Sequence, residues 1–213
     1  MQRLRLKFGR GSELKFLSHR DLMRLWERAF RRAGISPAYS EGFTPHPRIS
    51  LAAPLPVGIT SDAELMDVFL NEHMLPDDFM QKIKPQLPQG IEIHEVTTVN
   101  VNAPSLQSLV RFAEYSVEVE TTKNKTEIEA GLGNMLAAEK FAWHHSRDTG
   151  ERYYDLRSLI DDLWLITTQG NICSIGMRLR CDSSGSGRPE QVVKALGFTE
   201  LPGLIQRTQL VLA

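Results

Sequence analysis

Five arginines recur at spacings of one, three and four residues between residues 20 and 32, in a segment with helical periodicity. They are Arg20, Arg24, Arg28, Arg31 and Arg32. At about 100° per residue they fall within an arc of about 120°, so neighbours lie about 5–6 Å apart on one helix face. Guanidinium groups are planar forks that match phosphate oxygens. The row therefore predicts contact with a nucleic-acid backbone. The alternative is a solvated face that is neutralised by nearby acids or by acids of the second half of the chain.

A loop predicted over Pro37–Arg48 follows this helix and carries a second group of candidate residues. Tyr39 and Phe43 offer faces on which unpaired bases can stack. His46 can exchange protons near neutral pH, and Arg48 can hold a phosphate or a carboxylate. The alternative is a rigid loop whose aromatic rings close the core and whose His46 caps a turn.

Two further arginines are secondary candidates for binding an anion. Arg157 stands two residues after Asp155, on the same face of a predicted strand. The two side chains either bind a ligand or pair with each other. Arg188 precedes a helix predicted to begin at Pro189, and the free N–H groups of a helix start favour anions.

Histidine is the only residue type here that suggests catalysis. His19 and His46 are candidates for general acid–base chemistry in metal-independent RNA cleavage. His144 and His145 are adjacent on a predicted strand, so their side chains point to opposite faces and cannot easily share a metal ion. The two cysteines stand eight residues apart, with no CxxC motif. We expect no metal site, no cofactor and no catalytic activity of the chain's own.

The net charge of −1 conceals a strong asymmetry. Residues 1–50 hold 11 Lys and Arg against 4 acids, or +7, and the remainder carries −8. Such a split predicts a directed anionic partner, unless the two halves neutralise each other in the fold. No apolar run reaches the roughly 18 residues of a membrane helix, and the N-terminus lacks the apolar core of a signal peptide. We therefore expect a cytoplasmic protein that does not bind membranes.

The predicted elements of residues 1–100 follow the order β-α-β-β-α-β of a ferredoxin-like unit. Ser18 is a suitable N-cap and Gly34 a suitable helix end. The segments are a strand over Arg3–Phe8, a helix over His19–Ala33, strands over Ile49–Pro56 and Leu65–Asn71, a helix over Pro76–Leu87 and a strand over Gly90–Val99.

A polar, proline-containing segment, 101–108, is the predicted linker to a second half, 109–213. A similar order of elements begins there again, with altered strands. The segments are a strand over Ala113–Glu120, a helix over Lys125–Ala138, strands over Phe141–Arg147 and Arg152–Ile160 with a turn over Asp148–Glu151, strands over Leu163–Thr168 and Ile172–Arg180, and a helix over Pro189–Leu196. We therefore predict an α+β protein of two ferredoxin-like halves, with antiparallel sheets and helices on one face.

Several sequence runs resemble a bacterial domain family of unknown function known as radical-SAM-linked or radical-SAM-associated protein. The runs are KFLSHRDLMRLWERAFRRAG, AYSEGFTPHPRISLAAPLPVG, YDLRSLI and GSGRPEQVVKALGF. In that family the domain is often fused to, or encoded beside, a radical SAM enzyme. The resemblance implies an RNA-related role, and it assigns no catalytic residues. Because this chain lacks cluster-binding cysteines, it is expected to act as the partner domain.

Together these features favour an RNA-binding accessory module that presents tRNA or rRNA to a radical SAM partner. Two alternatives stay open. One is a metal-independent RNA endonuclease that uses His19 or His46, and the other is an adaptor whose basic half docks on an acidic partner protein.

Overall fold

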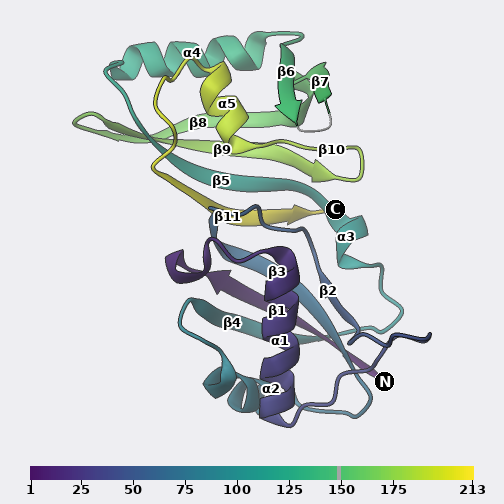
Figure 1. The fold of residues 1–213 in the computed structure, drawn as a ribbon. Helices are drawn as coiled ribbons and strands as arrows, with labels where there is room; N and C mark the ends of the chain where they lie inside the picture. Colours follow the sequence, from purple (N-terminus) through teal and green to yellow (C-terminus); the bar gives the residue numbers. More distant parts are fainter. Residues whose placement is uncertain (148–149) are drawn as a thin grey trace. The chain divides into compact units, whose positions relative to one another are not determined.

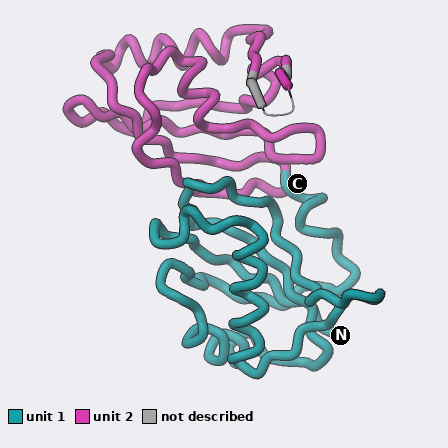
Figure 2. Tube along the Cα trace, in the orientation of Figure 1, with its two compact units in different colours: residues 1–110, 213 teal, residues 111–212 magenta. Residues whose placement is uncertain are grey.

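The computed structural model describes residues 1–147 and 150–213, and the side chains of all of these except residues 145–147 and 152. The chain divides into two compact units (Figure 2). Unit 1 comprises residues 1–110 together with Ala213, and unit 2 comprises residues 111–212.

Unit 1 is an antiparallel sheet with two helices packed against one face (Figure 1). The strand order is β4-β1-β3-β2, which is the order of a ferredoxin-like unit. The elements are β1 (Gln2–Arg10), the 3-10 turn η1 (Ser12–Leu14), α1 (His19–Ala33), β2 (Ile49–Leu51), β3 (Thr60–Leu70), α2 (Pro76–Ile83), the 3-10 turn η2 (Lys84–Gln86), β4 (Ile91–Val99) and the short helix α3 (Leu106–Leu109).

The core of unit 1 lies between the sheet and the helices. Leu4, Leu6 and Phe8 alternate along β1 and are fully buried, as period-two patterning requires. Trp26 of α1 is fully buried as well, and its ring lies 5.2 Å from that of Phe8 and 5.8 Å from that of Phe30. This packing fixes which side of α1 faces the sheet.

The limits of α1 agree with the prediction. The Ser18 hydroxyl accepts a hydrogen bond from the Asp21 N–H, and Gly34 ends the helix with φ of 64°. This left-handed conformation costs glycine little, because it has no Cβ.

Other limits in unit 1 differ from the prediction. β2 ends at Leu51, because Pro54 and Pro56 lack the N–H that a ladder requires, whereas β3 begins five residues earlier than predicted, at Thr60. The helix that begins at Pro76 ends at Ile83 and continues as η2, which contains Pro85.

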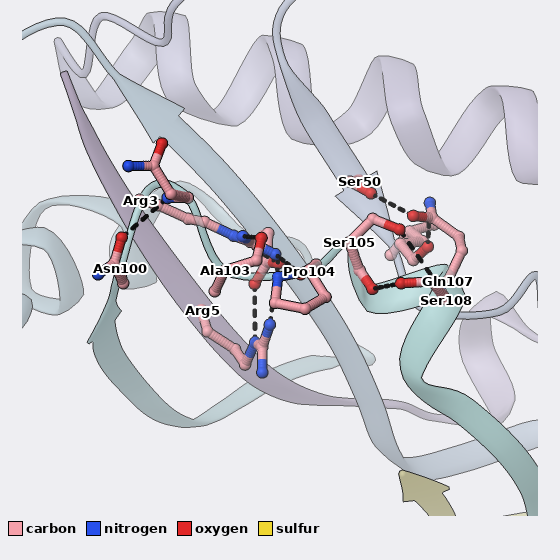
Figure 3. Close-up of polar contacts among 12 residues, drawn as sticks. Arg3, Arg5, Ser50, Asn100, Ala103, Pro104, Ser105, Gln107 and Ser108 are labelled. Atoms are coloured by element: carbon pink, nitrogen blue, oxygen red, sulfur yellow. Dashed lines mark hydrogen bonds and ion pairs between the residues drawn. The ribbon is translucent and has the colours of Figure 1, made fainter. Parts of the chain in front are cut away.

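The segment 101–108, which we expected to be a linker, lies within unit 1 and is bonded to its sheet (Figure 3). Arg3 of β1 donates to the carbonyls of Ala103 at 2.6 Å and Pro104 at 2.8 Å. The Gln107 amide donates to the Leu51 carbonyl at 2.7 Å. These bonds hold the segment 101–108 against β1 and β2.

Unit 2 repeats the same fold with an insertion. Its strand order, β11-β5-β9-β8, corresponds to that of unit 1, and the hairpin β6–β7 is inserted between the first helix and the second strand. The elements are β5 (Val110–Glu120), α4 (Lys125–Ala137), β6 (Ala142–Arg147), β7 (Gly150–Asp155), the 3-10 turn η3 (Arg157–Leu159), β8 (Ile160–Gln169), β9 (Ile172–Asp182), β10 (Gly185–Ser186), α5 (Pro189–Ala195) and β11 (Leu204–Leu212).

Two features of unit 2 depart from the expectation, and a third prediction is not tested. The last strand, β11, was not predicted. The strand predicted over Arg152–Ile160 is interrupted by η3. The turn predicted over Asp148–Glu151 lies partly outside the described residues, because residues 148 and 149 are not among them. The prediction of two ferredoxin-like halves is confirmed by the strand orders.

Candidate nucleic-acid interface

The arginine row of α1 is the central feature of the candidate interface. The opposite side of the helix, with Leu22, Trp26, Ala29 and Phe30, is buried against the sheet. All five arginines are exposed, namely Arg20, Arg24, Arg28, Arg31 and Arg32. From the helical rise of about 1.5 Å per residue, the row extends for about 18 Å.

The charges of this row are little compensated. Arg24 lies 3.5 Å from Asp21, in an exposed pair that counts for little. Arg32 donates to the Gln86 carbonyl, which leaves its charge in place. For Arg20, Arg28 and Arg31, the part of the chain that the structure describes holds no carboxylate within ion-pair distance. Among the described residues, pairing with acids therefore accounts for Arg24 alone.

A shallow groove runs beside the row, with a volume of about 350 Å³. Apolar atoms of Leu17, Leu25 and Pro88 line it. The charged lining consists of Asp21, Arg24, Arg28 and Arg32. A groove with this lining suits a nucleic-acid strand, which has charged phosphates as well as apolar sugar and base faces. The sequence prediction missed Leu25 of α1, Leu17, which precedes the N-cap Ser18, and Pro88 as groove residues.

The loop between α1 and β2 has the form of a hairpin and projects from unit 1 (Figure 1). At its base, the Ala38 N–H donates to the Phe69 carbonyl and the Arg48 N–H donates to the Ala38 carbonyl, both at 2.7 Å. Further out, the Ser40 N–H donates to the His46 carbonyl at 2.8 Å. These bonds order the base of the hairpin and leave residues 41–45 as its tip.

The aromatic rings of this hairpin do not close the core. The Phe43 side chain is fully exposed at the tip, and Tyr39 is 53% exposed. His46 is exposed, and its backbone N–H donates to the Ser40 hydroxyl at 3.0 Å. Arg48 is exposed as well, and its guanidinium lies 4.4 Å from the centre of the Phe69 ring. All four side chains are thus accessible from solvent.

The three arginines of β1, by contrast, are bonded within the unit, whereas Lys7 of the same strand is exposed. Arg3 donates to Asp67 Oδ2 with Nε at 2.9 Å, and Arg5 donates to Asp67 Oδ1 with Nε at 2.8 Å (Figure 3). Asp67 is fully buried and Arg3 is 2% exposed. Arg10 is also buried, and it donates to backbone carbonyls, including that of Pro56. The excess of +7 counted over residues 1–50 therefore overstates the charge available to a partner.

Arg157 is corrected as an anion-binding candidate. Its Nε and Nη2 donate to the Leu136 carbonyl at 3.2 and 2.9 Å, and its Nη1 donates to the Ile160 carbonyl at 2.6 Å. The side chain thus closes the end of α4, and it does not pair with Asp155. Arg188 is exposed just before α5.

The histidines show no catalytic arrangement. His19 and His46 are both exposed, and none of the described residues makes a side-chain hydrogen bond to either imidazole. The side chain of His145 lies outside the described residues. Within residues 1–147 and 150–213, no group of three or more His, Cys, Asp or Glu side chains is placed to hold a metal ion.

Among the described residues, no helix has the length and apolar character needed to cross a membrane.

The fold and the site define an α+β protein of two ferredoxin-like units, the first of which presents a basic helix and an aromatic hairpin. The chain belongs to the family described as an uncharacterized protein conserved in bacteria (DUF2344), which matches residues 3–189. A search of curated proteins finds no match.

Among solved structures, the chain is similar to one in the crystal structure of a Cbf5-Nop10-Gar1 complex. The identity is 7%, the TM-score is 0.53, and the match covers 98% of this chain and 48% of that one. The chain thus spans about half the length of that protein, and the likeness shows the fold alone. The small subunit of acetolactate synthase from Thermotoga maritima matches 100% of this chain and 96% of its own at 12% identity, but its TM-score of 0.26 carries no argument.

Proposed function

We propose that the chain is an RNA-binding accessory module that presents tRNA or rRNA to a radical SAM partner enzyme. The observation that carries the RNA-binding part is the row of five exposed arginines on α1, four of which have no carboxylate partner among the described residues. The link to a radical SAM enzyme comes from the family resemblance of the sequence runs.

The arginine row suits a phosphate backbone for electrostatic and geometric reasons. One guanidinium group can donate two parallel hydrogen bonds to the oxygens of a phosphate. Each phosphate that is neutralised also releases counterions. Arg24, Arg28 and Arg32 flank a groove whose apolar atoms can contact sugars or base faces. The backbone of the RNA is proposed to follow this face of α1.

The hairpin after α1 is proposed to contact exposed bases. Tyr39 and Phe43 present accessible rings, and bases stack on such rings without regard to sequence. His46 and Arg48 can bind a base edge or a terminal phosphate. Because stacking requires an open base face, the preferred RNA should have unpaired nucleotides.

An accessory role is favoured over catalysis by the surroundings of the histidines. General acid–base catalysis needs a group that is held within hydrogen-bond reach of the reacting proton. Both His19 and His46 stand exposed, without an orienting side chain among the described residues. If incubation with RNA in chelator gives site-specific cleavage that His46→Ala removes, the endonuclease alternative replaces this part of the proposal.

The proposal is tested by reversing charge on the row. The double variant Arg24→Glu/Arg28→Glu should lose most RNA binding, measured by fluorescence anisotropy with a labelled tRNA. The matched control is Lys125→Glu/Lys194→Glu, which makes the same charge change on exposed helix residues of unit 2. Equal affinity of the two variants would refute the role of the row, because net charge alone would then set binding.

The partner role needs its own test. The tagged protein should co-purify with a radical SAM enzyme from cells that encode both. If the partner is retained after nuclease treatment and binds equally well to the Arg24→Glu/Arg28→Glu variant, contact between the two proteins is independent of RNA. If the double variant loses a nuclease-resistant partner, the basic face docks on protein, and the adaptor alternative is favoured.

A further inference from the structure

Both units carry an aromatic hairpin in the same place in the fold. In unit 1, residues 37–48 form a hairpin between the first helix and the second strand of the β-α-β-β-α-β order. In unit 2, β6 and β7 form a hairpin between α4 and β8, which is the same interval. The correspondence is topological, because the two segments differ in length and sequence.

The hairpin of unit 2 is rich in aromatic and imidazole groups. His144 and Tyr153 are cross-strand partners, and their rings stack with centres 6.0 Å apart and planes 30° apart. Both side chains are exposed, and Tyr153 is 73% exposed. The Tyr154 hydroxyl donates to Gln191 of α5, which anchors the hairpin to the rest of unit 2.

A cavity of about 470 Å³ opens on this hairpin. Its lining includes Lys140, Trp143, His144, Tyr153 and Tyr154. Volumes of a few hundred Å³ with mostly aromatic walls are typical of sites for planar ligands.

We propose that the β6–β7 hairpin is a second nucleobase-binding site, which takes an unpaired base of the RNA. The base stacks on the exposed His144 and Tyr153 rings, and the exposed Lys140 contacts the adjoining phosphate. This inference rests on the proposed function, because it assumes that the protein binds RNA.

Charged groups of both signs lie at the hairpin. The hydrogen bond that the Tyr153 hydroxyl donates to Glu151 raises the pKa of the phenol above its ordinary value. Asp155 also lines the cavity, but its Oδ1 accepts from the Phe141 N–H at 2.8 Å and from the Arg157 N–H at 3.1 Å. Among the described side chains, the site thus holds one cation, Lys140, and two carboxylates that accept hydrogen bonds, Asp155 from backbone N–H groups and Glu151 from the Tyr153 hydroxyl.

The test uses the full chain and a single-stranded RNA oligonucleotide of mixed sequence, with the duplex of the same sequence as comparison. His144→Ala/Tyr153→Ala should weaken single-strand binding by about tenfold, within the range of one lost stacking contact. The slope of log affinity against log salt should stay unchanged, because no phosphate contact of the α1 row is lost. Tyr153→Phe should retain the affinity, because the ring is kept.

The control is Ile166→Ala, which truncates an exposed apolar residue of β8 outside the cavity. Ultraviolet cross-linking followed by peptide mapping should place RNA on residues 141–144 or 153–154 in the wild type. Wild-type affinity of His144→Ala/Tyr153→Ala, combined with lost binding by Arg24→Glu/Arg28→Glu, overturns the second site and leaves the proposed function standing. Failure of the wild type to bind any RNA overturns both. A protein cross-linked at the hairpin in place of RNA also overturns the nucleobase as occupant.

Discussion

Unit 1 contains two sets of arginines that look alike in the sequence and differ in the fold. Arg3 and Arg5 on β1 share one buried carboxylate, that of Asp67. The arginines of α1 stand exposed, and only Arg24 has a carboxylate neighbour among the described residues. One set holds the sheet and the segment 101–108 together, whereas the other set is free to meet a partner.

The difference shows that a count of charges does not measure a binding surface. A buried carboxylate must be paired, because the loss of its hydration costs several kcal/mol. The attraction between the two charges of the pair is of about the same size and offsets this cost. Exposed arginines keep their hydration and lose little by having no partner. Only the second kind contributes to an accessible field that attracts a polyanion. Substitutions in each set test this difference between buried and exposed arginines.

The largest effect is expected from Asp67→Asn. It leaves the 2%-exposed Arg3 and the half-buried Arg5 without their counterion, so the free energy of unfolding should fall by about 3–5 kcal/mol. Urea denaturation followed by circular dichroism measures this. Glu72→Gln, at an exposed acid of the same unit, should leave the midpoint nearly unchanged. A midpoint for Asp67→Asn equal to that control would show that the buried cluster is not structural.

Neutralising the helix set should produce the opposite result. Arg24→Gln/Arg28→Gln should change the free energy of unfolding by no more than about 0.5 kcal/mol per site, since the side chains are exposed. RNA affinity should fall, and the slope of log affinity against log salt should decrease by about 1.4, from about 0.7 for each phosphate contact with a single strand. A lower affinity with an unchanged slope would argue against phosphate contacts.

A substitution at the N-cap of α1 should change both the free energy of unfolding and, through the helix, RNA affinity. Ser18→Ala removes the acceptor for the Asp21 N–H, and it should lower the free energy of unfolding by about 1 kcal/mol. Ser18→Asn supplies an acceptor of the same kind and should restore it. RNA affinity should fall with Ser18→Ala only at temperatures where the first turn of the helix is lost. Hydrogen exchange of the first-turn amides distinguishes this local loss from global unfolding.

The smallest effect is expected at the exposed pair. Asp21→Asn breaks the 3.5 Å contact with Arg24 and should lower the free energy of unfolding by only about 0.5 kcal/mol or less. It also removes a negative charge from the groove, so RNA affinity should rise slightly at low salt. A loss of stability as large as that of Asp67→Asn would contradict the distinction between exposed and buried pairs.

The helix and its faces were predictable because they depend on local spacing. The N-cap Ser18 and the C-terminal Gly34 each act on the adjoining turn of α1, and the apolar stripe through Trp26 repeats at helical spacing. The exposure of Phe43 was left open by the sequence, since a loop aromatic can either close a core or face solvent. Hydrogen bonds at the base of the hairpin decide that it projects.

Other features depended on partners far away in the chain. Nothing near Arg3 and Arg5 indicates Asp67, which lies about 60 residues later and reaches them through the antiparallel register of β1 and β3. Arg157 donates to the carbonyls of Leu136 and Ile160, which come near it only because α4 ends beside η3. The sequence alone therefore left Arg157 as a candidate for anion binding. β11 was missed, although it completes the strand order of unit 2.

The sequence by itself determined the β-α-β-β-α-β order of the first half, the limits of α1 and the side of α1 on which its arginines lie. These follow from periodicity and capping, which act over a turn of helix or a few strand residues. Only the tertiary structure decided which positive charges are compensated and which aromatic side chains remain accessible. Burial and ion pairing join residues distant in sequence, and the cost of removing a charge from water then selects the arginines that must have a partner.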